Sequence, residues 1–123
     1  MDKKYHAEVR FVTVKKTTEE RPMKQPPNTF YIDVCFEPYE ELNAGNVWEP
    51  LGQDPKDARI NKPYFLNPTV TPGRKMSSLE CTQAMLKDQF EYEGNADNIQ
   101  SIVGVKVELV IEVVNGYPQI CGS

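Results

Sequence analysis

The sequence predicts a mainly β domain of five strands, with a single helix between the third strand and the fourth. Apolar and polar side chains alternate near the start of the chain, from residue 30 and again from residue 105, which is the period of a strand with one buried face. Only the segment after residue 77 has apolar residues three to four positions apart, the period of a helix. Composition limits the fold class, and local patterns then predict each element.

At 123 residues the chain has the length of one domain, enough to bury a core without disulfides or metal. Hydrophobic residues make up 39% and charged residues 26%, a globular balance, and no apolar run reaches the roughly 20 residues of a membrane span. No apolar signal-peptide core follows Met1, so we expect a cytoplasmic protein. The net charge of −4 argues against a duplex-DNA binder that relies on counterion release, but it allows a local basic groove.

The first strand begins at Tyr5 and runs to about Lys15. The residues expected on its inward face are Tyr5, Ala7, Val9 and Phe11. The next segment, at about residues 16–28, is charged and interrupted by prolines, so it cannot pack as a strand. We expect a long exposed loop there.

The second strand begins at Phe30, and Pro38 marks its end. Its inward residues are expected to be Phe30, Ile32, Val34 and Phe36, with Tyr31, Asp33 and Cys35 on the opposite face. Residues 37–58 are acidic and rich in turn-forming residues around the single tryptophan, Trp48. This segment is predicted to be a second long loop.

Residues 58–66 are short and apolar enough for a third strand, which Pro63 confines to an edge or a bulge. Ser77 and Glu80 have the spacing of a capping box, so the helix should begin there, and Gly94 with Asn95 should end it. The apolar stripe of this helix consists of Leu79, the methyl group of Thr82, Met85, Leu86 and Phe90.

The strongest strand pattern covers residues 102–114, where aliphatic residues alternate with lysine and glutamate. Asn115 and Gly116 follow at the two positions where a type I′ hairpin turn needs positive φ. A fifth strand should therefore run back from Tyr117 to Cys121. Four phenylalanines are expected in the resulting core, because aromatic side chains dominate cores: Phe11, Phe30, Phe36 and Phe90.

This order of elements is that of an OB-fold, a partly open five-stranded barrel, so residues 1–123 are interpreted as a single OB-like domain. OB-folds bind oligonucleotides or oligosaccharides on the face of strands two and three, between the loops joining strands one to two and four to five. Cations there track phosphates and aromatic rings stack on bases. The candidate nucleic-acid-binding residues are Lys15, Lys16, Arg21, Lys24, Tyr31, Trp48, Arg59, Lys62, Tyr64 and Tyr117.

The end of the chain carries a family resemblance. The segment DNIQSIVGVKV at residues 97–107, followed by VIEVVNGYPQI at residues 110–120, resembles the closing strands of phage-encoded single-stranded DNA-binding proteins of the OB-fold type. The resemblance implies binding of single-stranded DNA without strong sequence preference, in phage DNA replication or recombination, within the host cell cytoplasm. It also implies replication or recombination proteins as partners. Single-stranded binders often associate, and an edge strand near Pro63 offers a surface for a homo-oligomer.

Each candidate also has a purely structural interpretation. The tyrosines and Trp48 can lie half-buried at the rim of a barrel, and the lysine-rich loop can be a solvated surface balanced by Glu19 and Glu20. The rival function is a small protein-binding module, a phage-type inhibitor or assembly factor, that uses the acidic loop around Trp48 to bind a basic partner. A DNA binder should weaken when the basic loop is neutralised. A protein-binding module should instead depend on Trp48 and its acidic neighbours.

Neither catalysis nor a cofactor is predicted. His6 has no serine or cysteine motif nearby, and no phosphate-binding glycine loop or other catalytic motif is present. The acidic residues of the second loop lack the ligand spacing of a calcium site, so no metal is expected. The three cysteines are widely spaced and are expected to be small buried hydrophobes: Cys35, Cys81 and Cys121.

Overall fold

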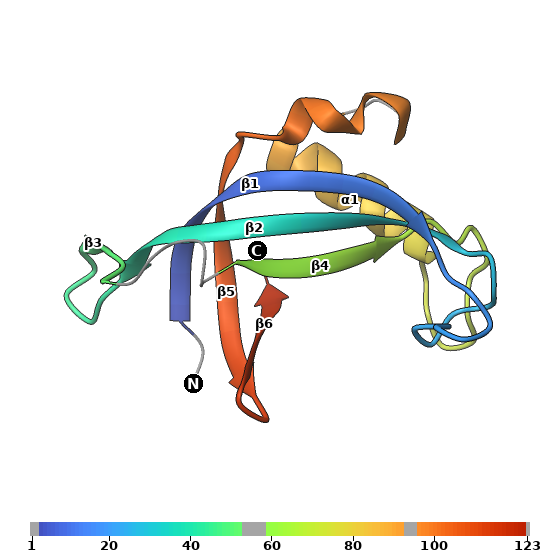
Figure 1. The fold of residues 1–123 in the computed structure, drawn as a ribbon, viewed down its shortest axis with the longest axis horizontal. Helices are drawn as coiled ribbons and strands as arrows, with labels where there is room; N and C mark the ends of the chain where they lie inside the picture. The colour runs from blue at the N-terminus through green and yellow to red at the C-terminus, as the bar shows by residue number, and fades with distance from the viewer. Residues whose placement is uncertain (1–2, 53–58, 93–95, 123) are drawn as a thin grey trace.

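The computed structural model describes residues 3–52, 59–92 and 96–122 of the chain (Figure 1). The protein is mainly β, as predicted. The elements are β1 (Lys3–Lys16), β2 (Phe30–Leu42), β3 (Trp48–Pro50), β4 (Ile60–Phe65), α1 (Ser78–Phe90), the 3-10 helix η2 (Ala96–Ile102), β5 (Lys106–Val114) and β6 (Tyr117–Gly122). Within these ranges, no helix combines the length and apolar character that a membrane span requires.

The six strands form one antiparallel sheet, in which five follow the order β3-β2-β1-β5-β6 and β4 lies off this path. Strand β4 pairs with the first half of β2, and β3 pairs with its last three residues. The predicted five-stranded barrel is therefore wrong in two respects, because a sixth strand is present and the sheet is not closed into a barrel. Strands β4 and β6 contact each other, yet no ladder joins them in the described ranges. Each contains a proline, Pro63 or Pro118, which lacks an N–H to donate to a ladder.

Strand β2 extends beyond the predicted end at Pro38 as far as Leu42. Pro38 is tolerated inside the strand because it pairs with Ala7 next to a register shift between His6 and Ala7. The added length of β2 pairs with β3, so the predicted loop at 37–58 is in part a hairpin. The remainder of that loop, residues 53–58, lies outside the described ranges.

The helix begins as predicted. The Ser77 hydroxyl accepts a hydrogen bond from the Glu80 amide at 3.1 Å, and the Glu80 carboxylate accepts one from the Ser77 amide at 3.3 Å. It ends earlier than predicted, since Glu91 takes the left-handed conformation at φ 52°; Gly94 and Asn95 are outside the described ranges. The predicted fourth strand also begins later, at Lys106, because η2 occupies residues 96–102.

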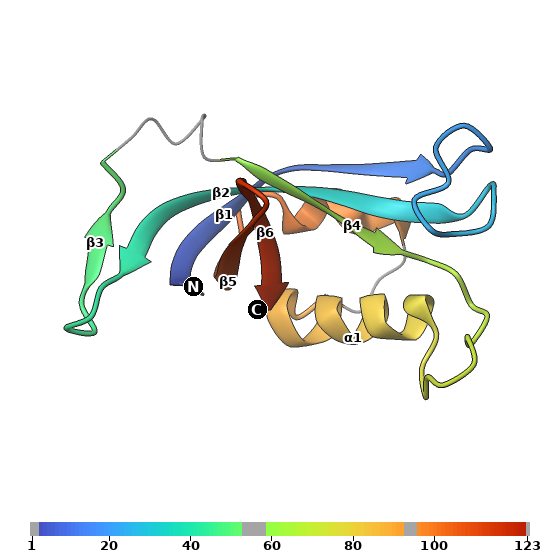
Figure 2. The same ribbon diagram turned by 90° about the horizontal axis from the view of Figure 1, so that it is seen from below.

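The core lies between the sheet and α1, and η2, which contacts β1, contributes Ile99 and Ile102 to it. Figure 2 shows α1 beneath β1, β2 and β4, leaving the opposite face of these three strands uncovered by any helix. The fully or nearly buried apolar residues are Ala7, Val9, Val12, Ile32, Val34, Phe36, Ile60, Leu86, Ile99, Ile102, Val107, Leu109 and Ile111. Phe36 is in this core and Phe90 packs against it, as predicted.

The prediction that Phe11 and Phe30 are buried is wrong, since each side chain is 55% exposed. Phe30 is the first residue of β2 and lies beyond the buried residues of that strand. For Phe11 the cause is a second register shift in β1. Val9 pairs with Phe36 and Phe11 pairs with Cys35, so Arg10 is an extra residue without a partner in β2. Such a bulge reverses the faces of the residues that follow it, which buries Val12 and exposes Phe11.

Candidate nucleic-acid interface

The uncovered face of β1, β2 and β4, here called the outer face, presents three rows of paired residues. Strand pairing and alternation place on it Phe11, Cys35 and Asn61 in the first row, Thr13, Asp33 and Pro63 in the second, and Lys15, Tyr31 and Phe65 in the third. The outer face therefore combines aromatic rings, a lysine and small polar groups on three adjacent strands.

At one end of the outer face, Arg59 covers an aromatic ring. Its guanidinium carbon lies 5.1 Å from the centre of the Phe11 ring, a cation–π distance. The Nε atoms of Arg59 and Arg10 lie 3.2 and 3.1 Å from the same carboxylate oxygen of Glu37. Glu37 thus orients two guanidinium groups beside the exposed ring, and Arg10 forms a second ion pair through its Nη1 atom, which lies 3.0 Å from a Glu8 carboxylate oxygen.

At the other end, Lys15 and two aromatic rings share the third row. The Lys15 ammonium donates to Asp33 at 3.0 Å, and this hydrogen bond, together with the charge of Asp33, raises the pKa of Lys15. Tyr31 was expected to be exposed to a ligand, but its side chain is only 7% exposed. Its ring tilts against the half-buried Phe65 ring, with 5.5 Å between the centres. Tyr31 therefore supports Phe65.

The loop of residues 17–29 is held in one shape by Thr17, which is 1% exposed. Its hydroxyl donates to the Pro26 carbonyl at 2.8 Å and accepts from the Thr29 amide at 2.9 Å. The Thr17 amide also donates to the Thr29 carbonyl, so the two ends of the loop are tied together. This loop was predicted to be exposed, and Lys24 and Arg21 are exposed on it as expected.

A cleft of about 760 Å³ lies between this loop and the segment that leads into α1. The two segments lie side by side at the same end of the sheet in both ribbon views (Figures 1 and 2). The cleft, here called the loop cleft, is lined by Met23, Lys24, Gln25, Pro26, Thr29, Phe65, Asn67, Thr69, Thr71, Arg74 and Ser78. Its described lining contains two cations and no carboxylate.

Lys62 and Tyr64 do not belong to the outer face. Lys62 pairs with Val34 and Tyr64 pairs with Ile32, so alternation directs both toward the side of the sheet that carries the core. The Lys62 ammonium lies 5.3 Å from the centre of the Tyr64 ring. Tyr64 packs against the core, and burial raises the pKa of its hydroxyl to about 12.

Trp48 lies at the end of the sheet opposite the loop cleft, on β3 (Figure 2). Its ring stacks on the His6 ring with 3.6 Å between the centres. His6 Nδ1 in turn lies 2.8 Å from a Glu40 carboxylate oxygen, and Nε2 lies 3.7 Å from Glu108. Trp48 is thus engaged within the protein and surrounded by acidic groups, an unfavourable setting for a phosphate backbone.

The three remaining candidates are dispersed. The Lys16 ammonium lies 6.0 Å from the centre of the exposed Phe30 ring at the end of β1. Arg21 occupies the loop of residues 17–29, and Tyr117, 73% exposed, lies at the β5–β6 hairpin. Of the ten predicted residues, the structure places Lys15, Tyr31 and Arg59 on or beside the outer face and Lys24 in the adjoining loop cleft.

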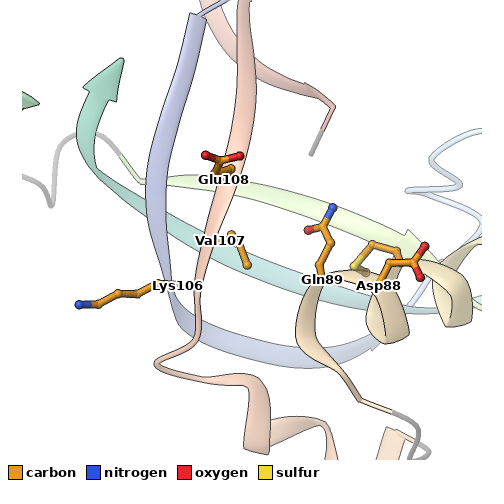
Figure 3. Close-up of a pocket in the computed structure, with 6 residues that line it drawn as sticks. Asp88, Gln89, Lys106, Val107 and Glu108 are labelled. Atoms are coloured by element: carbon orange, nitrogen blue, oxygen red, sulfur yellow. The ribbon is translucent and has the colours of Figure 1, made fainter. Parts of the chain in front are cut away.

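A second cleft of about 530 Å³ separates α1 from β5 (Figure 3). Its lining consists of Met85, Asp88, Gln89, Lys106, Val107 and Glu108. Figure 3 shows Lys106 extending away from Asp88 and Gln89, and its ammonium lies 5.7 Å from the centre of the Tyr39 ring. Because Asp88 and Glu108 are acidic and the cation points elsewhere, this cleft suits a phosphate poorly.

The described residues include no group of three or more histidine, cysteine or acidic side chains that could hold a metal. Cys35 is buried as predicted, and its burial raises the pKa of the thiol, which disfavours the reactive thiolate. Cys81 is exposed on α1, so the prediction that it is buried is wrong. The side chain of Cys121 is outside the described set.

Sequence reasoning missed Phe11, Phe65, Arg10 and Arg74 as candidates. The one available indication was the pair Phe11-Val12, because two adjacent large apolar residues break the alternation and mark a bulge. Comparisons with protein-family models, with curated proteins and with solved structures found no match for this chain.

Proposed function

We propose that the protein binds single-stranded DNA without strong sequence preference, on the outer face of β1, β2 and β4. No catalytic step and no cofactor are part of the proposal. The family resemblance of the closing strands supports a role in phage DNA replication or recombination, with proteins of those processes as partners. The physical support comes from the order of the strands, the exposed aromatic surface and the distribution of charge.

The strand pairing supports a comparison with the OB-fold. If β3 is set aside as an addition to β2, the order β4-β2-β1-β5-β6 is an OB sheet that has been left open between β4 and β6. Helix α1 then stands between the third and fourth OB strands. The outer face corresponds to the surface on which OB-folds bind oligonucleotides.

The observation that carries the proposal is the exposed Phe11 ring beside Arg59 and Arg10. Phe11 lies in the middle of a strand with its side chain 55% exposed, so a base can stack on the part of the ring that Arg59 does not cover. The neighbouring guanidinium groups are planar donors that suit phosphate oxygens. Stacking on aromatic rings is indifferent to the identity of the base, which accounts for the absence of sequence preference.

The net charge of −4 is compatible with this function because charge is distributed unevenly. Lys15, Lys24, Arg59 and Arg74 line the outer face and the loop cleft, while acidic side chains gather around Trp48. A single strand needs a local cationic path. Asp33 and Glu37 hold Lys15 and Arg59 in place on the face, whereas the described lining of the loop cleft, which contains Lys24 and Arg74, has no carboxylate.

The test is fluorescence anisotropy of a labelled oligo-dT titrated with the protein at low and at moderate salt. Saturable binding that salt weakens, and that duplex DNA does not compete, is the expected result. Failure of micromolar protein to bind would overturn the proposal. An RNA oligonucleotide of the same length, run in parallel, reports the preference between the two nucleic acids.

A protein-binding module is the second candidate, and the surroundings of Trp48 favour it. Glu41 and Glu49 pair directly across β2 and β3, where like charges are unfavourable. Such a concentration of acid suits a basic partner. Titration with an oligo-arginine peptide, followed by the fluorescence of the single tryptophan, tests this function; a saturable change that Glu49→Gln weakens would favour it.

A further inference from the structure

The loop cleft has the size and chemistry of a site for one nucleotide unit. Its volume of about 760 Å³ falls within the range of small-molecule sites, roughly 300–1,000 Å³. The described lining offers Lys24 and Arg74 as cations, and threonine, asparagine and glutamine side chains as neutral hydrogen-bonding groups. The second cleft, between α1 and β5, is instead lined by two carboxylates, those of Asp88 and Glu108.

Phe65 joins the loop cleft to the outer face. It is the last residue of β4, it lines the cleft, and its ring rests on Tyr31 in the third row of the outer face. A strand that crosses Phe11 and Lys15 along this face would next reach Phe65. The cleft therefore lies on the continuation of the path that the proposed function requires.

The walls of the cleft are held in place before any ligand binds. The side-chain amide of Asn67 donates a hydrogen bond to the side-chain oxygen of Gln25 at 3.3 Å, which links the two segments across the cleft. The Leu79 amide donates to the Asn67 carbonyl, which fixes the second segment to the start of α1. The cleft is thus preorganised, and ordering its walls costs little when a ligand binds.

The backbone at Lys24 takes a left-handed conformation within a closed turn. Met23 and Lys24 have φ values of 53° and 62°, in the left-handed region that residues other than glycine rarely adopt. The Gln25 amide donates to the Pro22 carbonyl, closing the turn that contains both residues. This geometry sets the direction in which the Lys24 side chain leaves the backbone at the wall of the cleft.

We propose that the loop cleft binds one nucleotide at the end of the bound strand, with its phosphate between Lys24 and Arg74 and its base against Phe65. This inference rests on the proposed function. The threonine side chains of the lining contact the sugar and the edge of the base, while Asn67 and Gln25 hold the walls together. Oligonucleotides that reach the cleft should therefore bind more tightly than those that occupy the outer face alone.

The test uses the full chain, its Lys24→Gln and Arg74→Gln variants, and Lys75→Gln as a matched control. Lys75 is exposed next to Arg74 but does not line the cleft, so its variant has the same change of charge. Each protein is titrated with oligo-dT of about 4 and of about 16 nucleotides, the limits of OB-fold site sizes, over a series of salt concentrations. Thermal unfolding confirms that each variant is folded.

For the long oligonucleotide we expect each cleft variant to lose roughly tenfold in affinity, the value of a hydrogen bond to a charged group. The slope of log K against log salt should fall by about 0.7 for each phosphate that the variant no longer neutralises. The short oligonucleotide and the Lys75→Gln protein should bind as before. If the unaltered protein binds the long oligonucleotide and Arg74→Gln behaves like Lys75→Gln, the loop cleft is not a nucleotide site. If the unaltered protein binds neither oligonucleotide, the proposed function itself fails.

Discussion

The guanidinium carbon of Arg59 lies 5.1 Å from the centre of the Phe11 ring, and the contact depends on the residue before Phe11 in the chain. Arg10 has no partner residue in the β2 ladder, and this bulge turns Phe11 to the outer face, beside Arg59. Phe11 is in β1 and Arg59 directly precedes β4, and these two strands do not pair with each other. Their proximity follows from the pairing of both β1 and β4 with β2.

Replacement of Phe11 by alanine should weaken binding of oligo-dT while leaving the fold intact. A stacked base contributes about 1–3 kcal/mol, so the dissociation constant should rise roughly fivefold to more than a hundredfold. Phe30→Ala is a matched control, because Phe30 is equally exposed but lies two residues before the core-facing Ile32. Its side chain is therefore on the core side of the sheet, away from the outer face. Anisotropy measures the affinity and thermal unfolding the stability. Equal losses in the two variants would contradict the assignment of the outer face.

Replacement of Glu37 by glutamine should strengthen binding. The carboxylate of Glu37 holds both Arg59 and Arg10, and its removal makes the Arg59 guanidinium available to phosphates, while Arg10 keeps its ion pair with Glu8. An ion pair near the surface contributes about 1 kcal/mol or less, so the expected gain in affinity is roughly two- to fivefold, with a steeper dependence on salt. Glu91→Gln, beyond the end of α1, is the control for net charge. Weaker binding by Glu37→Gln would contradict this prediction, because it would mean that the loss of arginine positioning outweighs the release of the cations.

The hydroxyl of Tyr64 should make the protein less stable at high pH. Its pKa is about 12 in the folded protein against a usual value of 10.0, because burial disfavours the tyrosinate. The neutral form is preferred on folding, so this contribution is complete below pH 10 and is lost as the pH rises toward 12. The loss amounts to about 2 kcal/mol at the upper limit. Urea unfolding of the unaltered protein and of Tyr64→Phe, compared across this range, isolates the effect; parallel curves would contradict it.

Replacement of Thr17 by valine should destabilise the protein by about 1–3 kcal/mol, the cost of leaving buried partners unsatisfied. Valine has nearly the same shape but cannot donate to the Pro26 carbonyl or accept from the Thr29 amide. Thr13→Val is the control, since Thr13 is exposed on β1, the strand that leads into the loop. Urea unfolding gives the stability, and cleavage by trypsin after Lys24 reports whether the loop has opened. A stability equal to that of Thr13→Val would contradict the role of the hydroxyl.

The sequence predicted those elements whose cause is local. The capping box of Ser77 and Glu80 fixes the start of α1 through two hydrogen bonds between residues three positions apart. Asn115 and Gly116 both have positive φ, 52° and 81°, as the hairpin turn requires. These features depend on neighbouring residues alone, so a sequence is sufficient to find them.

The sequence did not predict features that depend on pairing between distant strands. The two register shifts of β1 arise from its alignment with β2, and they decided the positions of Phe11 and Pro38. Trp48 lies in a short strand because β2 continues past Pro38, and it stacks on His6, which is far away in the sequence. The sequence predicted cations and aromatic rings beside β2, and of the ten candidates only Lys15, Tyr31 and Arg59 lie on or beside the outer face.

Arg10, the extra residue of the β1 bulge, also bears on how the outer face tolerates changes in chain length. Substitution of Arg10 would change one charge, whereas deletion of the residue would remove the bulge and leave Phe11 directly after Val9, still opposite Cys35 on the outer face. Val12 would likewise stay opposite Val34 on the core side. The bulge thus absorbs one residue of β1, so the alignment of this strand with β2, more than its exact length, determines whether the Phe11 ring is presented.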